Sequence, residues 1–183
     1  MYDWIKISVL AAALTLSQPV FAQDCPASEN RDIEKNTLHA ELLAAPKEML
    51  ARPISDQLWM IWNTAPDARS QQLLDLGREQ IRYSDYDQAV ENLTDLVEYC
   101  PDYAEGWNQR AFAHFLRHDY DAALDDISVV LELEPRHFGA LAGRASVLIS
   151  TGRTDVGFRS LRDAMRINPW ISERHMLPPG EDI

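Results

Sequence analysis

The sequence predicts an all-α protein built from stacked, antiparallel helix pairs, and three observations lead to this fold class. Pro101, Pro135 and Pro169 are spaced 34 residues apart, and each follows an amphipathic stretch that is typical of a helix. The same period aligns two sets of positions that hold only Gly or Ala. Apolar residues make up 46% of the 183 residues and charged residues 25%, which is an ordinary composition for one globular domain.

Each period is expected to hold two amphipathic helices joined by a tight turn. Tiny side chains let the two backbones approach closely, and proline ends the second helix because it lacks an N–H and disfavours helix at the residue before it. One pair cannot bury its apolar face alone, so the pairs stack. The tiny positions are Gly77, Ala111 and Ala145, and Ala89, Ala123 and Gly157. The expected helices cover 68–83 with 86–99, 103–117 with 120–133, 137–151 with 154–167, and a short last helix at 170–176.

The middle period resembles the tetratricopeptide repeat family. The family's marks stand there as Trp107, Ala111, Tyr120, Ala123, Ile127 and Pro135. The resemblance covers residues 70–171 and implies a right-handed superhelical solenoid with units at 70–103, 104–137 and 138–171. Residues 172–183 are then a C-terminal cap and tail.

Residues 23–66 are expected to form an N-terminal tail and one more helical pair. The two helices are placed at 32–45 and 54–64, because Pro46 and Pro53 break the pattern between them. We interpret the pair as a degenerate repeat or a cap of the stack. The alternative is an unrelated helical arm packed on the stack.

Residues 1–22 are interpreted as a secretory signal peptide. Lys6 precedes an apolar run at 7–16, and Val20-Phe21-Ala22 supplies a cleavage site before Gln23. A retained membrane anchor is the alternative, but the run is shorter than the roughly 20 residues that a spanning helix needs. A lipoprotein would place cysteine directly after the cut, whereas Cys25 is third. We therefore expect the periplasm of a Gram-negative bacterium, and no membrane span once the peptide is removed.

Export would place the two cysteines in an oxidising compartment, where a disulfide can form and persist. Cys25 and Cys100 are the only thiols of the chain, and a disulfide between them would fasten the N-terminal tail. The alternative is two unpaired thiols. Two cysteines are too few for a disulfide-rich mini-fold or a four-cysteine zinc site.

The charge of the chain limits its partners. The net charge is −12, which disfavours nucleic acid, because phosphate binding needs clustered Lys and Arg. Residues 67–135 carry 5 basic and 16 acidic side chains, whereas residues 136–183 carry 7 and 5. A protein or peptide with a basic patch would be steered to the acidic middle of the stack.

No catalytic motif is present, so we expect neither an enzyme nor a cofactor. The sequence holds no nucleophile elbow, phosphate-binding loop or Cys/His cluster. His114 and His118 have the spacing of two metal ligands on one helix face, but packing of His114 explains it as well, and no third ligand is indicated. The carboxylates at 119–126 are expected on a solvated face, with Arg110 reaching Asp126 across its unit.

The family resemblance implies where a partner would bind, since the first helix of each unit lines a concave groove. Phe112 and Phe115 are the strongest candidates as aromatic anchors, with core filling as the alternative. An acidic-tail clamp is not implied, because its positions hold Leu74, Gly139 and Gly143. The groove residues carried over are Arg78, Ile81, Arg82, Asn108, Phe112, Phe115, Leu116, Ala142, Ser146 and Ile149.

Three functions follow as hypotheses. The first is an exported scaffold that binds a protein or peptide in the groove. The second is a self-associating structural element that pairs through the region of Trp59 and Trp62 or through its C-terminal face. The third and least favoured is a metal-dependent enzyme that uses His114 and His118. The oligomeric state is not predicted.

Overall fold

Amphipathic segments and proline stops set the helices of the computed structural model, which describes residues 24–180. The predicted signal peptide lies outside the described residues. Within residues 24–180 all regular structure is helical, and no helix is long and apolar enough to cross a membrane. The helices are α1 (Asp32–Ala44), α2 (Glu48–Trp62), α3 (Ala68–Arg82), α4 (Tyr86–Tyr99), α5 (Ala104–Leu116), α6 (Tyr120–Leu133), α7 (Phe138–Ser150), α8 (Thr154–Met165) and the short 3-10 helix η1 (Ser172–Met176).

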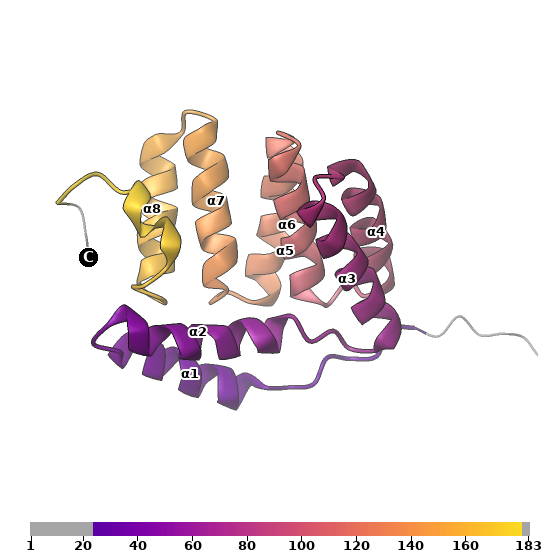
Figure 1. Ribbon diagram of the computed structural model, residues 1–183, viewed down its shortest axis with the longest axis horizontal. Helices are drawn as coiled ribbons and strands as arrows, with labels where there is room; N and C mark the ends of the chain where they lie inside the picture. The colour runs from indigo at the N-terminus through magenta and orange to yellow at the C-terminus, as the bar shows by residue number, and fades with distance from the viewer. Residues whose placement is uncertain (1–23, 181–183) are drawn as a thin grey trace, which may run out of the picture.

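Helices α3 to α8 stand side by side as three antiparallel pairs (Figure 1). The first helices of the pairs, α3, α5 and α7, follow one another along one side of the stack and contact each other. The predicted all-α fold of stacked helix pairs is confirmed. The expected last helix is the 3-10 helix η1, which begins two residues later than predicted.

Tiny residues at the helix crossings explain the tight packing within a pair. A Cβ added to Gly77 of α3 would lie 2.5 Å from Cγ of Leu93 on α4, and one added to Gly157 of α8 would lie 2.7 Å from Cγ1 of Ile149 on α7. Leu93 is fully buried. No side chain larger than hydrogen fits at these two crossings without moving a neighbour.

The turn inside each pair places one residue in the left-handed region. These residues are Ser84, His118 and Gly152, with φ of 62°, 66° and 79°. They stand 34 residues apart, so each pair turns at the same position. Only the third pair has glycine there, the one residue without a steric penalty in this conformation.

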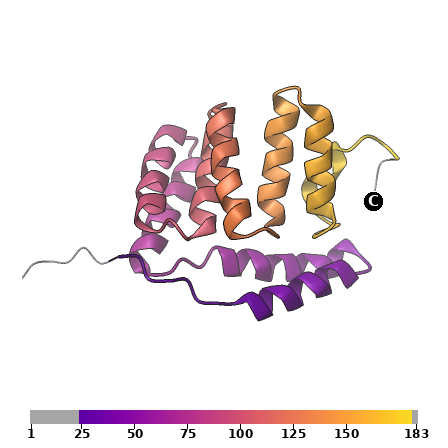
Figure 2. The same ribbon diagram turned by 180° about the vertical axis from the view of Figure 1, so that it is seen from behind.

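The N-terminal helices α1 and α2 lie across the lower ends of the stacked helices rather than beside α3, as both views show (Figures 1 and 2). Trp62 of α2 stacks on the ring of His137 at 4.0 Å between centroids. At the far end Arg174 pairs with Glu48 at 2.8 Å. We call α1 and α2 the arm. The arm crosses the stack and does not extend it, so it lies as a cap or a packed arm would and not as a further repeat.

Helix α2 corrects the prediction that Pro53 breaks the second segment. The helix begins at Glu48 and continues through Pro53. A proline inside a helix costs about 3 kcal/mol or more. Burial of Ala51, Leu58 and Trp62 along one face of the helix, each less than 5% exposed, favours the helix against this cost.

The predicted disulfide between Cys25 and Cys100 is confirmed. The two Cα atoms lie 5.2 Å apart, although 75 residues separate the cysteines in the chain. Cys100 follows α4 and is buried in the core of the first pair, where Leu74 and Leu96 are also buried. The bond therefore holds the segment that precedes α1 against the first helix pair.

Candidate functional site

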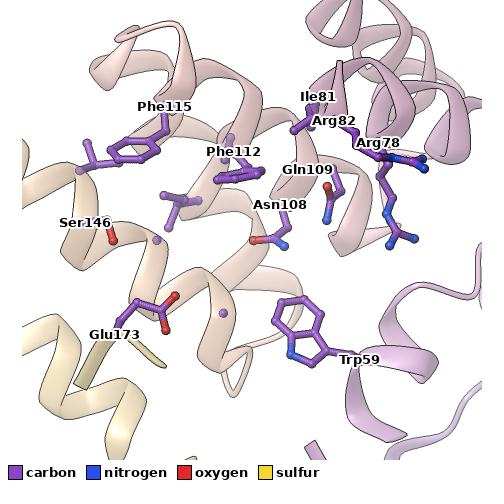
Figure 3. A pocket seen from close by; sticks show the side chains of 15 residues that line it. Trp59, Arg78, Ile81, Arg82, Asn108, Gln109, Phe112, Phe115, Ser146 and Glu173 are labelled. Carbon is purple, nitrogen blue, oxygen red and sulfur yellow. The ribbon is translucent and has the colours of Figure 1, made fainter. Parts of the chain in front are cut away.

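The first helices of the three pairs enclose a groove of about 440 Å³ (Figure 3). Helices α3, α5 and α7 supply most of its lining, α2 adds Trp59, and η1 adds Glu173. The lining residues are Trp59, Arg78, Ile81, Arg82, Asn108, Gln109, Ala111, Phe112, Phe115, Ile127, Gly139, Gly143, Ser146, Val147 and Glu173.

The structure brings together most of the groove residues that the sequence predicts. Seven line the groove: Arg78, Ile81, Arg82, Asn108, Phe112, Phe115 and Ser146. Leu116 and Ile149 do not. Ile149 faces Gly157 on α8, so its side chain packs against the second helix of its own pair and not into the groove. Ala142 lines a separate cavity of about 260 Å³, next to Trp170.

The two phenylalanines divide between groove and core. Phe112 keeps 47% of its surface exposed and lies in the middle of the groove, as Figure 3 shows. Phe115 is half-buried, and its ring lies 6.0 Å from that of Tyr120 within the core of the second pair. Phe112 is therefore available to a ligand, whereas Phe115 packs against the core of the second pair behind the groove lining.

Eight lining residues were not predicted as groove residues. Gln109, Gly139 and Gly143 lie on the same helices as the predicted groove residues. Assigning every position of those helices to the groove side or the opposite side would have identified them. Trp59 and Glu173 lie outside the 34-residue periods, and no sequence signal places them at the groove. Those missed are Trp59, Gln109, Ala111, Ile127, Gly139, Gly143, Val147 and Glu173.

Trp59 reaches the groove because Gly139 leaves room for it. A Cβ on Gly139 would lie 2.5 Å from Cη2 of the Trp59 ring. The indole meets His137 and Phe138 edge to face, with centroids 5.5 and 5.7 Å away. One end of the groove is thus built by the arm.

A buried hydrogen-bond network fixes this end of the groove. The backbone N–H of Ala140 donates to Nδ1 of His137 at 3.1 Å, so the ring proton lies on Nε2 and is donated to Glu105 at 3.0 Å. Both side chains of the pair are fully buried. The Glu105 carboxylate also accepts from the side-chain amides of Asn108 and Gln109, at 3.1 and 2.6 Å. It therefore orients two polar groups of the groove lining.

The groove carries opposite charges at its two sides. Arg78 and Arg82 of α3 lie on one side, and Glu173 lies on the other, as Figure 3 shows. The Oγ of Ser172 donates to Glu173 at 3.0 Å. Apolar side chains, with Phe112 in the middle, fill the space between them.

The suggested metal pair is not on one helix face. Helix α5 ends at Leu116, so His118 lies in the turn, where Tyr120 Oη contacts its Nδ1 at 2.8 Å. His114 lies 3.9 Å from Asp126, and burial lowers the pKa of its imidazole. Across residues 24–180 no group of three or more His, Cys, Asp or Glu side chains is placed to hold a metal ion.

The expected contact between Arg110 and Asp126 is present. The guanidinium donates two hydrogen bonds to the carboxylate, at 2.8 and 2.7 Å, and a third at 3.2 Å to the Thr94 hydroxyl. It also lies 4.8 Å from the ring centre of Trp107. The ion pair joins the two helices of one unit, the bond to Thr94 reaches α4 of the preceding unit, and both belong to the architecture.

Comparisons with known proteins agree with this fold. No family model matches the chain. It is 32% identical over 119 residues to a TPR repeat-containing protein of Rhizobium etli, which covers 65% of this chain. The chain spans only 58% of that protein's length.

Two solved structures are similar in fold. The TPR2B domain of yeast Sti1 in a pHsp70 complex has a TM-score of 0.56 at 22% identity, over 60% of this chain and 91% of that domain. YrrB, described as a TPR protein with an unusual peptide-binding site, has a TM-score of 0.54 at 18% identity. The match covers 70% of this chain and 62% of the YrrB chain. The chain therefore has the tetratricopeptide repeat fold, and the resemblance to that family is confirmed.

Proposed function

We propose that this protein is an exported scaffold of the bacterial envelope that binds a peptide segment of another protein in its groove and catalyses no reaction. One observation carries the proposal: seven residues predicted as ligand contacts line one preformed groove. A preformed surface binds with little ordering cost. The pHsp70 complex of Sti1 and the peptide-binding site of YrrB support a peptide as the ligand class.

The proposed location is the periplasm. It rests on the predicted signal peptide at 1–22 and on the disulfide between Cys25 and Cys100, a bond that persists in oxidising compartments. The net charge of −12 favours a partner that carries a basic patch, since opposite net charges speed the encounter. An association rate that falls as the salt concentration rises would reveal this long-range contribution.

Site-specific photo-crosslinking in cells tests the binding proposal. A photoreactive phenylalanine analogue replaces Phe112 in the groove or, as the matched control, Val156 of α8, which is 43% exposed and outside the groove lining. We expect discrete adducts from position 112 that are absent from position 156. The same adducts from both positions, or none from position 112, would contradict the proposal.

Blocking the groove gives the second arm of this experiment. A Cβ added to Gly143 meets only Cδ1 of Ile127, at 3.8 Å, so a long side chain there would extend into the groove without disturbing the core. Gly143→Met should abolish the adducts while the protein remains folded. Adducts that survive the block would place the partner elsewhere.

Self-association is a second candidate function, favoured by apolar side chains on the outer surface of the arm. Met49 is 76% exposed and Met60 61% exposed, both on α2. The region first suspected is different, because Trp62 is buried and Trp59 is half-buried against α7. Light scattering across a concentration series tests this function. A monomer at the highest concentration contradicts it, and a dimer lost in Met49→Ser/Met60→Ser supports it.

A further inference from the structure

We propose that the groove selects a dipolar segment: a carboxylate at the α3 side, an apolar side chain in the middle and a cationic group at the η1 side. This inference rests on the proposed peptide-binding function and names the chemistry of the ligand. It follows from three features of the lining, which are an arginine pair, an unpaired carboxylate and an exposed aromatic ring.

The acidic end of the ligand is assigned by Arg78 and Arg82. The two residues are one turn apart on α3, both are exposed, and both line the groove. Among residues 24–180 neither has an ion-pair partner, although this region of the chain is rich in acidic side chains. Guanidinium groups bind carboxylates through paired hydrogen bonds, so an acidic side chain or a C-terminal carboxylate is the complementary group.

The cationic end is assigned by Glu173. This side chain is half-buried, lines the groove from η1, and accepts a hydrogen bond from Ser172. The neighbouring Arg174 does not neutralise it, because its guanidinium pairs with Glu48 of the arm at 2.8 Å. Within the described residues Glu173 has no ion-pair partner, so its charge is left to a Lys, an Arg or an amino terminus of the ligand.

The middle of the groove takes an apolar side chain. Phe112, Ile81 and Ile127 line it, and Phe112 keeps 47% of its surface exposed. The volume of about 440 Å³ is in the lower half of the range of ligand pockets, roughly 300–1,000 Å³. A short segment therefore fits better than a folded domain.

Uniformly charged ligands fit less well. A segment acidic along its whole length would place one carboxylate beside Glu173. A wholly basic segment would place one cation beside the arginine pair. Either arrangement sets like charges together in the groove, which disfavours binding.

Three labelled peptides of equal length test the inference by fluorescence polarisation with the purified protein. They are Lys-Lys-Phe-Leu-Glu-Glu, Glu-Glu-Phe-Leu-Glu-Glu and Lys-Lys-Phe-Leu-Lys-Lys. We expect the dipolar peptide to bind about tenfold more tightly than either uniform one, as two or three partly exposed charge pairs would give. Equal affinity for all three would overturn the inference. Tightest binding of the all-basic peptide would also overturn it, because the net charge alone would then decide.

Charge reversal makes the test specific for the assigned residues. Glu173→Lys should shift the preference to the all-acidic peptide, and Arg78→Glu/Arg82→Glu should shift it to the all-basic peptide. The matched control is Arg153→Glu, an exposed arginine in the turn before α8 and outside the groove, which should leave the preference unchanged. Thermal unfolding of each variant verifies that it is folded.

Two kinds of failure are distinguishable. If Gly143→Met abolishes peptide binding but the charge reversals change no preference, the groove binds peptides and the dipolar selection is wrong. If binding survives in Gly143→Met, or the wild type binds none of the three peptides, both the inference and the proposed function are contradicted.

Discussion

His39 is a buried histidine whose Nδ1 has no hydrogen-bond partner in the structure. Burial, with Arg136, Lys35 and His137 nearby, lowers the pKa of its imidazole from 6.5 to about 4. Because the unfolded chain takes up this proton at higher pH than the folded chain, stability is lost as the pH falls from 6.5 towards 4. The loss is roughly 3 kcal/mol, at about 1.4 kcal/mol for each pKa unit.

Urea unfolding of the wild type and of His39→Phe across this pH range measures the effect. The variant keeps a ring against Trp62 and loses the titrating group. We expect the difference in unfolding free energy between the two proteins to change in favour of the variant as the pH falls. A difference that stays constant between pH 7 and 4 would show that His39 does not titrate in this way.

Ser84 is strained in a way that its sequence neighbours do not reveal. Its φ of 62° matches that of Gly152 in the third turn, where glycine carries no penalty. Ser84→Gly should therefore raise the unfolding free energy by about 0.5–1 kcal/mol, and Gly152→Ala should lower it by about 1 kcal/mol or more.

An exposed helical position provides the control for these two variants. Gln72→Gly in α3 should cost about 1 kcal/mol, because glycine weakens a helix interior. If Ser84→Gly destabilises the protein as Gln72→Gly does, the turn is not left-handed. The sequence reveals the 34-residue period of these turns, but a serine or a histidine at the turn position does not by itself indicate a positive φ.

At the scale of the helices, two glycines in the stack should respond oppositely to the same substitution. Gly77→Ala would bring its Cβ to 2.5 Å from the buried Leu93 and should cost about 1–3 kcal/mol. Gly143→Ala would bring its Cβ only into ordinary van der Waals contact with Cδ1 of Ile127, at 3.8 Å, and should gain about 0.5–1 kcal/mol from improved helix propensity. Thermal unfolding compares the two, and equal shifts would contradict the helix crossing described for α3 and α4.

The disulfide joins the N-terminal segment to the end of α4. Loss of the bond should lower the unfolding free energy by about 2–4 kcal/mol, because the unfolded chain gains freedom. Denaturation of the wild type with and without dithiothreitol, beside Cys25→Ser/Cys100→Ser, measures it. Reduced wild type and double variant should agree. A double variant as stable as the oxidised protein would mean that the bond contributes nothing to stability.

Helix positions in the stack were predictable because proline stops and tiny residues act locally. Helices α3 to α8 lie within two residues of the expected ranges at each end. The arm was less predictable. Pro53 is a strong local stop, but the helix continues through it because Trp62 is buried against His137 and Phe138, which lie more than 70 residues away in the chain. Such distant contacts leave no periodic signal.

At the scale of the whole molecule, the groove is assembled from three regions of the chain. The repeat register predicts the part on α3, α5 and α7, which explains why Arg78, Asn108 and Phe112 were found. The ends depend on Trp59 of the arm and Glu173 of η1, whose positions follow from tertiary packing. The opposite charges at the two sides of the groove could therefore not be predicted from the sequence.

We expect the ligand to bind on the side of the stack formed by the first helices, α3, α5 and α7. A titration of ¹⁵N-labelled protein with the tightest of the three peptides, followed by NMR chemical shifts, tests it most directly. We predict that the largest shifts fall on groove residues of α3, α5 and α7, such as Arg78, Asn108, Gly143 and Ser146. Shifts that fall instead on α4, α6 and α8, or on the outer surface of the arm, would contradict binding in the groove.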